Sequence, residues 1–475
     1  MSEIALRSAK EIIFGVGTRA KLVVQDFDLV SRHVGGGGAA GSTTVSVYPH
    51  LIGDDSSAGT GAGFVRFDGA RTAHLLTGSE YASTITSGDT TPHNVSLSSA
   101  VTGIDAATTI NALRLVAGGS VAGTGSLTVN TGDVLATAAG TELDVALAYG
   151  ARSAVFVTSA GADLTVKQGI SGSSPDAYGL VKSGPGTLVL EAANTYDGIT
   201  TVNNGTLVVR ANGALSGTGA GTLVLRGATL AFDGGVAYAA AEPVTLSGTG
   251  AGEPGAVVGL TGANSFAGAI TLAGHADIGA QAGSLTLSAP VDGAYNVTKT
   301  GAGAVVYNAL NGYTGSTTVA DGTLRLLAPL QALMVSPITV DAGATLAVAG
   351  GGQRIASLSG PAGAAVVLAD KAALFVDGRY TIQAREQVDG KLFSICDLVS
   401  DPPSRWLSRE AGKGASIGYD PWLHTPASVE ALRKGAEEAG ARLVAVEDNP
   451  IDAIWSDRPP APCAPVVPHP EKLAG

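Results

Sequence analysis

The stretch GLVKSGPGTLVLEAANTYDGITTVNNGTLVVR, residues 179–210, decides the fold of this chain. It contains three short runs, Thr187–Leu190, Ile199–Val202 and 206–209, in which Leu, Val or Ile is mixed with Thr, as is typical of β-strands. Gly-Pro-Gly at 184–186, the segment 194–198 and Asn-Asn-Gly at 203–205 separate the runs. Because Gly and Asn tolerate a positive φ, these separators predict tight turns.

The same pattern returns at 299–326 as KTGAGAVVYNALNGYTGSTTVADGTLRL. Its landmarks keep one constant spacing along the chain, so that Lys182 matches Lys299, Asn194 matches Asn311, Tyr196 matches Tyr313 and Gly205 matches Gly322. A looser copy, ANSFAGAITL, occupies 263–272. Since one such unit cannot bury both of its faces and stacked units can, the repeats predict a parallel β-solenoid.

The bulk composition limits the function classes. The chain has 475 residues, 67 of them glycine, with 14% charged side chains and a net charge of −12. An acidic chain without a basic stripe argues against a nucleic-acid surface. No apolar run approaches the roughly 20 residues of a membrane-spanning helix, and the first residues lack the features of a secretory signal.

Composition also divides the chain. The density of charged side chains more than doubles after residue 360, and all three tryptophans and both cysteines lie beyond it. We therefore expect an N-terminal segment of unclear fold at 1–35, a β-solenoid at 36–360 whose first strand is 43–47, and a small α/β domain at 361–475. The α/β part alternates strands such as Ala372–Val376 and Ser416–Tyr419 with a helix that begins at Pro426.

The repeats, together with the segment VSVYPHLIGDDSSAGTGAGFVRFDGARTAHLLTGSEY at 45–81, resemble the autotransporter-associated β-strand repeat proteins over about 40–350. This resemblance implies a right-handed β-helix exported to the bacterial cell surface. The sequence departs from that pattern because it lacks a signal peptide and the alternating strands of a membrane barrel. Localisation is therefore left open.

The C-terminal part resembles the N-terminal domain of Xaa-Pro aminopeptidase, a creatinase-type family. DGRY at 377–380, GYDPWLH at 418–424 and DAIWSDRP at 452–459 carry this resemblance. In that family a following catalytic domain holds two divalent metals, typically Mn, and members are mostly cytoplasmic. We expect this chain to carry only a truncated N-terminal domain and no cofactor. The junction near 360 is either a natural fusion or an assembly error.

No residue set points to catalysis, so we predict no catalytic, cofactor-binding or metal-binding residue. The candidates that we interpret as turn, cap or surface residues are His33, His50, His74, His93, His275, His424, His469, Asp377, Asp420, Asp452 and Asp457. Cys396 and Cys463 lack the spacing of a metal site and are interpreted as plain thiols.

Two recurring side chains leave alternatives open. Tyr196, Phe266 and Tyr313 form either an aromatic stripe for sugars or, as we prefer, internal packing. Asn194, Asn264 and Asn311 predict a stacked turn ladder. The preferred function is a non-catalytic structural or surface-display solenoid, with polysaccharide or protein contacts along it and oligomerisation through the C-terminal domain. The alternative is an Xaa-Pro aminopeptidase fragment that acts only with a supplied catalytic domain.

Overall fold

The structure is a computed structural model, and the described residues are 12–16, 18–24, 37–54, 62–67, 73–149, 152–173, 178–217, 219–327, 338–341, 343–348, 358–359, 363–368, 370–376, 384–385, 388–419 and 426–446. The chain divides into two compact units. One comprises Met1–Gly363 with Arg379–Phe393, and the other comprises Ala364–Gly378 with Ser394–Gly475.

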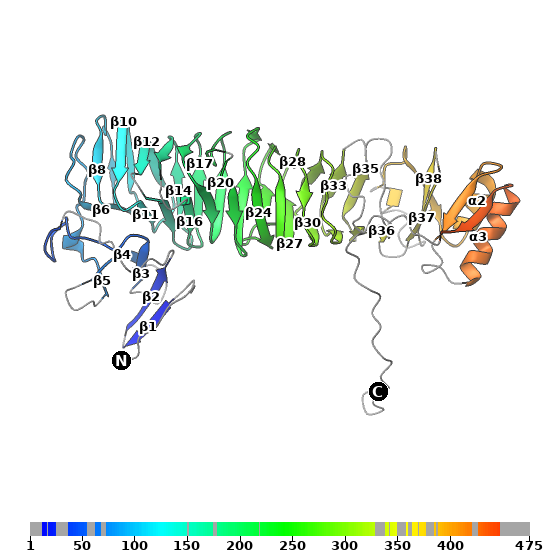
Figure 1. The fold of residues 1–475 in the computed structure, drawn as a ribbon, viewed down its shortest axis with the longest axis horizontal. Helices are drawn as coiled ribbons and strands as arrows, with labels where there is room; N and C mark the ends of the chain where they lie inside the picture. Colours follow the sequence, from blue (N-terminus) through cyan, green and yellow to red (C-terminus); the bar gives the residue numbers. More distant parts are fainter. Residues whose placement is uncertain are drawn as a thin grey trace, which may run out of the picture. The chain divides into compact units, whose positions relative to one another are not determined.

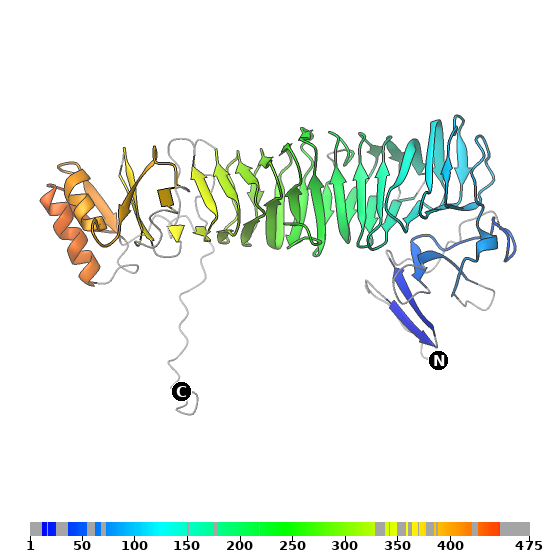
Figure 2. The same ribbon diagram turned by 180° about the vertical axis from the view of Figure 1, so that it is seen from behind.

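The first unit is a parallel β-solenoid of about 12 turns, which confirms the predicted fold class. Figures 1 and 2 show its strands stacked side by side along one axis. Strands follow one another around each coil on three faces, and each strand pairs in parallel with the strand one coil away. The right hand implied by the resemblance stays a prediction.

Face 1 is one continuous ladder. Its strands are β6 (Asn94–Leu97), β9 (Ala112–Leu115), β11 (Asp133–Ala136), β13 (Ala154–Thr158), β16 (Tyr178–Ser183), β19 (Ile199–Val202), β21 (Thr222–Val224), β24 (Val244–Gly248), β27 (Ile270–Ala280) and β29 (Val291–Asp292).

Face 2 follows face 1 in each coil and forms a second ladder. Its strands are β7 (Ala100–Val101), β10 (Ser120–Val129), β12 (Thr141–Tyr149), β14 (Asp163–Val166), β17 (Thr187–Leu190), β20 (Gly205–Val209), β22 (Ala228–Phe232), β25 (Val257–Gly259), the end of β27, β30 (Val297–Thr300), β32 (Thr317–Val319), β34 (Ile338–Val340) and β36 (Leu358–Ser359).

Face 3 closes each coil, and its strands form two ladders. The first contains β8 (Thr108–Ile110), the ends of β10 and β12, β15 (Ile170–Gly172) and β18 (Thr195–Tyr196). The second contains β23 (Ala237–Tyr238), β26 (Ala263–Phe266), β28 (Ser284–Leu287), β31 (Ala304–Tyr307), β33 (Thr323–Leu326) and β35 (Thr345–Val348).

The core is a set of aliphatic columns inside these faces. Along face 2, Leu188 pairs with Leu207, Leu207 with Leu230, and Leu230 with Val257. These side chains are at most 1% exposed. Each buried aliphatic side chain stabilises the fold by about 1.5–3 kcal/mol. Because these columns run from coil to coil, a sequence poor in aromatics still has a continuous core.

An antiparallel sheet precedes the solenoid, made of β1 (Ile12–Val16), β2 (Thr18–Val24), β3 (Leu51–Asp54), β4 (Ala62–Phe67) and β5 (Ala73–Leu75), followed by the 3-10 helix η1 (Gly78–Glu80). Val47, Ile52 and Phe64 pack against Leu135 and Val155, which point outward from face 1. The parallel strands that the structure describes begin at Asn94, after this antiparallel sheet. The domain bounds given in the sequence analysis stay a prediction.

The strand predicted at 43–47 is wrong. The chain turns there and makes only isolated bridges, such as Gly38 with Val45. Its carbonyl groups instead accept hydrogen bonds from Asn94 in the first coil. Asn94 N donates to Thr43 O at 2.7 Å, and Asn94 Nδ2 donates to Val45 O at 2.8 Å. These bonds satisfy backbone groups next to the first strand, which would otherwise lack partners.

On the outer side of face 2, charged side chains of opposite sign from neighbouring coils form ion pairs. Lys167 Nζ lies 2.7 Å from Glu142 Oε2. Arg210 bridges Glu191 at 2.9 Å and Asp233 at 3.0 Å. Because these pairs are partly exposed and water screens their charges, they stabilise the fold little.

The second unit is the expected small α/β region. It contains β37 (Gly363–Val367), β38 (Ala372–Val376), β39 (Phe393–Asp397), α2 (Pro403–Glu410), β40 (Ser416–Tyr419), α3 (Pro426–Glu438) and β41 (Arg442–Ala445). Strands β37–β39 form one sheet, and β40 pairs in parallel with β41. Phe375 and Trp406 meet edge to face at 6.1 Å in its core, which also contains the buried thiol of Cys396.

Candidate functional site

The repeat signature builds a buried lysine site, which we call the first lysine cage: the Lys182 ammonium and the main-chain oxygens of Ser183, Gly184 and Asn204. Lys182 lies on β16, points into the solenoid and is 0% exposed. Its Nζ donates to the three oxygens at 3.0, 2.7 and 2.9 Å respectively. Two of these oxygens belong to its own coil and Asn204 O belongs to the next, so the ammonium ties two turns together.

The second lysine cage repeats this arrangement. Lys299 on β30 is 1% exposed. Its Nζ donates to Gly301 O, to Gly303 O at 2.6 Å and to Asp321 O at 2.7 Å. Gly205 and Gly322 close the two cages with φ of +70° and +59°, and a Cβ at either position would collide with two glycine carbonyl oxygens and the ammonium. Both positions therefore require glycine.

Burial sets the electrostatics of both cages. It lowers the pKa of Lys182 to about 7 because desolvation penalises the charged form. It lowers the pKa of Lys299 to about 8, with the Asp321 carboxylate acting in the opposite direction. Carbonyl dipoles hydrogen-bond the charged form, which makes an ammonium tolerable without a paired carboxylate.

The recurring asparagines and tyrosines also point inward. Asn194 Oδ1 accepts Ile170 N at 2.8 Å, and Asn311 Oδ1 accepts Val291 N at 2.8 Å. The Tyr196 hydroxyl lies 2.6 Å from Thr200 Oγ1, as the Tyr313 hydroxyl does from Thr317 Oγ1.

The burial of the recurring aromatic side chains decides between a sugar-binding stripe and internal packing. Tyr196, Phe266 and Tyr313 are 4%, 0% and 1% exposed, which confirms internal packing and excludes a sugar-binding stripe at these positions. The asparagines do not stack on one another, because Asn194, Asn264 and Asn311 each bond backbone groups, Asn264 Oδ1 accepting Gly235 N and Val236 N at 3.0 Å. The predicted ladder is thus a set of side-chain to backbone bonds.

One carboxyl group lies inside the solenoid. Glu242 is 0% exposed, and its Oε1 accepts Thr222 Oγ1 at 2.9 Å. Its Oε2 has no hydrogen-bond partner within the described part of the chain. Burial raises the pKa of Glu242 to about 7. The sequence analysis missed this group because a lone Glu between alanine and proline carries no motif.

Three of the histidines that we interpreted as turn, cap or surface residues contact different partners in the first unit. His50 Nδ1 lies 2.9 Å from Asp133 Oδ1, His93 Nδ1 lies 2.8 Å from Thr43 Oγ1, and the His275 ring meets Tyr295 edge to face. Within the described residues no three His, Cys, Asp or Glu side chains could hold a metal ion together. The remaining candidates, His33, His424, His469, Asp377, Asp420, Asp452, Asp457 and Cys463, lie outside the described residues.

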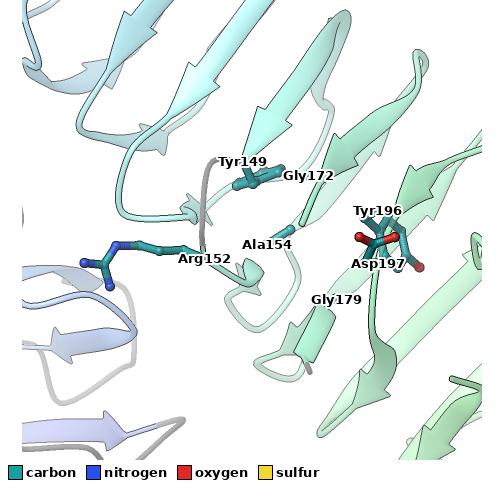
Figure 3. A pocket seen from close by; sticks show the side chains of 7 residues that line it. All are labelled: Tyr149, Arg152, Ala154, Gly172, Gly179, Tyr196 and Asp197. Atoms are coloured by element: carbon teal, nitrogen blue, oxygen red, sulfur yellow. The ribbon is translucent and has the colours of Figure 1, made fainter. Parts of the chain in front are cut away.

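A shallow hollow lies between neighbouring coils. Figure 3 shows the side chains that line it: Tyr149, Arg152, Ala154, Gly172, Gly179, Tyr196 and Asp197. Arg152 points away from Asp197, so the two charged side chains do not converge (Figure 3). The hollow has no room for a water-sized molecule, whereas ligand pockets usually have about 300–1,000 Å³, so it is too small to hold a ligand.

Comparison with known families defines the class of both parts. Residues 180–209 and 297–326 match the Passenger-associated-transport-repeat family. Both lysine cages lie within these matches. These two segments of the β-solenoid are therefore similar to passenger-associated repeats.

Residues 351–454 match the Creatinase/Prolidase N-terminal domain family. A probable Xaa-Pro aminopeptidase P of Penicillium rubens is 38% identical over 124 residues, which are 26% of this chain and 20% of the relative. A probable Xaa-Pro aminopeptidase P of Sordaria macrospora is 40% identical over 125 residues, with the same shares. The chain thus spans about a fifth of the length of these relatives. No solved structure matches the chain.

The chain therefore joins passenger-associated repeats to a region homologous to the N-terminal part of aminopeptidase P. The motifs 377–380 and 452–459 lie outside the described residues, as do residues 420–424. None of the helices in the described ranges is long and apolar enough to cross a membrane.

Proposed function

We propose that the chain is a non-catalytic scaffold of the surface-display type, in which the solenoid holds the creatinase-type region as a module. One observation carries this proposal. Lys182 and Asn194, which define the repeat together with their counterparts, bond to neighbouring coils inside the fold. The hydroxyl of Tyr196, the third recurring side chain, contacts Thr200 in the buried interior. The signature is thus used to stack coils, and it leaves the outer surface free to vary.

The test has a localisation arm and a contact arm. Intact expressing cells are treated with protease and probed with an antibody to the solenoid. Loss of the signal without cell lysis is expected, whereas protection in intact cells and cleavage only after lysis would contradict surface display. Binding of purified chain to cell-surface polysaccharide tests the proposed contacts along the solenoid.

A second candidate is favoured by the 38–40% identity to probable Xaa-Pro aminopeptidases P. On this alternative, the C-terminal region assists peptidase chemistry when a catalytic domain with two divalent metals is supplied. Full-length chain is incubated with Mn²⁺ and an Xaa-Pro peptide, with and without the catalytic part of a relative. Release of the N-terminal residue by this chain alone would overturn the non-catalytic proposal.

Oligomerisation through the C-terminal unit is also a proposal. The exposed apolar side chains Val367, Val399 and Val444 in this unit support it. Sedimentation of the chain with and without Val444→Lys on β41 tests it, and an unchanged monomer in both samples would contradict it.

A further inference from the structure

The chain contains three Asn-Gly pairs, Asn204–Gly205, Asn212–Gly213 and Asn311–Gly312. An asparagine followed by glycine is chemically labile, because no side chain hinders the following amide nitrogen from reaching the asparagine Cγ. In a folded protein the reactivity depends on what holds the side-chain amide and the following nitrogen. The three sites differ in this respect.

At Asn204 the two reacting groups are held against each other. Gly205 N–H donates to Asn204 Oδ1 at 2.7 Å. Because Oδ1 is bonded to Cγ, this contact places the nitrogen beside the carbon that it must attack. Asn204 lies on an exposed turn, and its main-chain oxygen is fixed at 2.9 Å from Lys182 Nζ.

At the other two sites the asparagine side-chain oxygen accepts from backbone groups other than the following glycine. Asn212 Oδ1 accepts the backbone N–H groups of Ala239 and Ala240 at 2.9 and 3.2 Å, from the next coil. Asn311 is 7% exposed and its Oδ1 accepts Val291 N. The Gly312 nitrogen is itself engaged, since it donates to Val291 O and Asp292 Oδ1, both at 3.0 Å.

The second repeat shows that this turn accommodates the product. Asp321–Gly322 occupies the position of Asn204–Gly205, and Gly322 N donates to Asp321 Oδ1 at the same 2.7 Å. The main-chain oxygen of Asp321 bonds Lys299 as that of Asn204 bonds Lys182. A carboxylate at this corner therefore fits the lysine cage.

We propose that Asn204 is a self-modification site, at which the folded chain selectively converts the asparagine of the first lysine cage into aspartate or isoaspartate. Hydroxide removes the Gly205 N–H proton, and the nitrogen forms a bond to Asn204 Cγ. The Cγ–Nδ2 bond breaks, and Nδ2 leaves as ammonia with a proton from water. Water then adds to one carbonyl carbon of the succinimide: cleavage of the N–Cγ bond gives aspartate, and cleavage of the N–C bond gives isoaspartate.

The conversion places a negative charge beside the buried Lys182 ammonium. The second cage already has such a charge, and Asp321 favours the charged form of Lys299. Modification therefore makes the first cage resemble the second. It gives the solenoid a slow, irreversible change of charge at one coil.

The experiment uses the full chain in mildly alkaline buffer. Samples are digested over time, and mass spectrometry follows the gain in mass at each of the three Asn-Gly peptides, while fragmentation separates aspartate from isoaspartate. A parallel sample unfolded in denaturant gives the intrinsic rates. In the folded chain Asn204 should react on the order of tenfold faster than Asn212 and Asn311, which corresponds to about 1.4 kcal/mol in barrier.

Two variants complete the test. Asn204→Asp should fold and match one of the two products, and Asn204→Gln should show no reaction at that peptide because its longer side chain disfavours ring closure. Comparable rates at the three sites in the folded chain would overturn the proposal, as would a reaction of Asn204 that occurs only after unfolding.

Discussion

The two passenger-associated repeats have the same interior contacts but lie on different faces of the solenoid. Lys182 pairs with Val202 on face 1. Lys299 lies on face 2, in the ladder that runs from Leu188 through Leu207, Leu230, Val257 and Ile278. The asparagines differ in the same way. Asn194 bonds Ile170 N on face 3, whereas Asn311 bonds Val291 N on face 1. The whole second repeat is therefore rotated by one face.

This comparison shows what the repeat specifies. It fixes a lysine, two turns and an inward Asn and Tyr relative to one another, and it does not fix which face they occupy. The exterior changes freely, since Glu191 and Arg210 in the first copy are replaced by Asn308 and Leu327 in the second. The repeat is thus a local unit for joining one coil to the next.

The largest loss of stability is expected when a glycine that closes a lysine cage is replaced, and it should exceed the loss at a glycine elsewhere in the solenoid. Gly205→Ala and Gly322→Ala should each destabilise the solenoid by about 3 kcal/mol or more, because the Cβ meets backbone oxygens at a positive φ. Gly227→Ala is the matched control, since its φ is +85° with nothing within 4 Å, and should cost about 1–2 kcal/mol. Chemical denaturation followed by circular dichroism measures all three, and equal losses would contradict the cage.

The lysines themselves come next. Lys182→Met and Lys299→Met should each cost about 2–4 kcal/mol, because buried carbonyl oxygens lose their donor. Lys167→Met removes a partly exposed lysine that pairs with Glu142 and should cost much less than either cage variant, because water screens this pair. Lys182→Met and Lys299→Met should lower the free energy of unfolding by similar amounts, although the two lysines lie on different faces. If one of the two variants were as stable as the wild type, the two cages would not be equivalent.

Stability should also depend on pH in two opposing windows. Glu242, with its pKa raised to about 7, binds its proton more tightly when folded, so stability falls as the pH rises from about 4.5 to 7. Lys182 and Lys299, with pKa values lowered to about 7 and 8, bind protons less tightly when folded, so stability rises from there towards pH 10. Denaturation midpoints across this range should pass through a minimum near neutrality. Glu242→Gln should remove the acidic limb and leave the alkaline limb, and a flat profile in the wild type would be inconsistent with these burials.

A smaller and symmetric effect is expected from the tyrosines. Tyr196→Phe and Tyr313→Phe each remove one buried hydroxyl contact with a threonine, at a cost of about 1 kcal/mol. Thermal denaturation of both variants measures this cost. Losses that differ by more than about 1 kcal/mol would show that the two interiors are not equivalent.

The smallest loss of stability is expected for the ion pairs on the outer surface of the solenoid. Arg210→Ala should cost at most about 1 kcal/mol, and this cost should shrink in high salt because the pairs with Glu191 and Asp233 are partly exposed. Denaturation at low and high salt checks it. If Arg210→Ala lost as much stability as Lys182→Met, the surface ion pairs would stabilise the solenoid as strongly as the buried lysine does, which contradicts this account.

Much of this fold could be predicted from short-range patterns. The runs Thr187–Leu190 and Ile199–Val202 are strands with the predicted bounds, and β20 extends its run by one residue. Ser416–Tyr419 and the helix that begins at Pro426 were also predicted correctly. In these segments apolar spacing and turn residues agree with the final structure, so local information suffices.

The remainder depended on long-range contacts. Strand β16 was missed because Lys182 resembles a polar interruption, and only the carbonyl oxygens of the next coil explain how it is buried. Strand β18 was hidden within a segment interpreted as a turn. The rotation of the second repeat could not be predicted, because coil lengths between the copies vary, as with the longer connection between β22 and β25.

The most direct test of the account is an NMR titration of the lysine side chains in the full chain, with Lys182→Met and Lys299→Met used for assignment. The account predicts that Lys182 titrates near pH 7 and Lys299 near pH 8, whereas exposed lysines titrate near about 10.4. Both ammonium groups should also exchange their protons slowly. If both lysines titrated with the exposed ones and exchanged rapidly, the signature lysines would lie in solvent and the repeat would not join coils in this way.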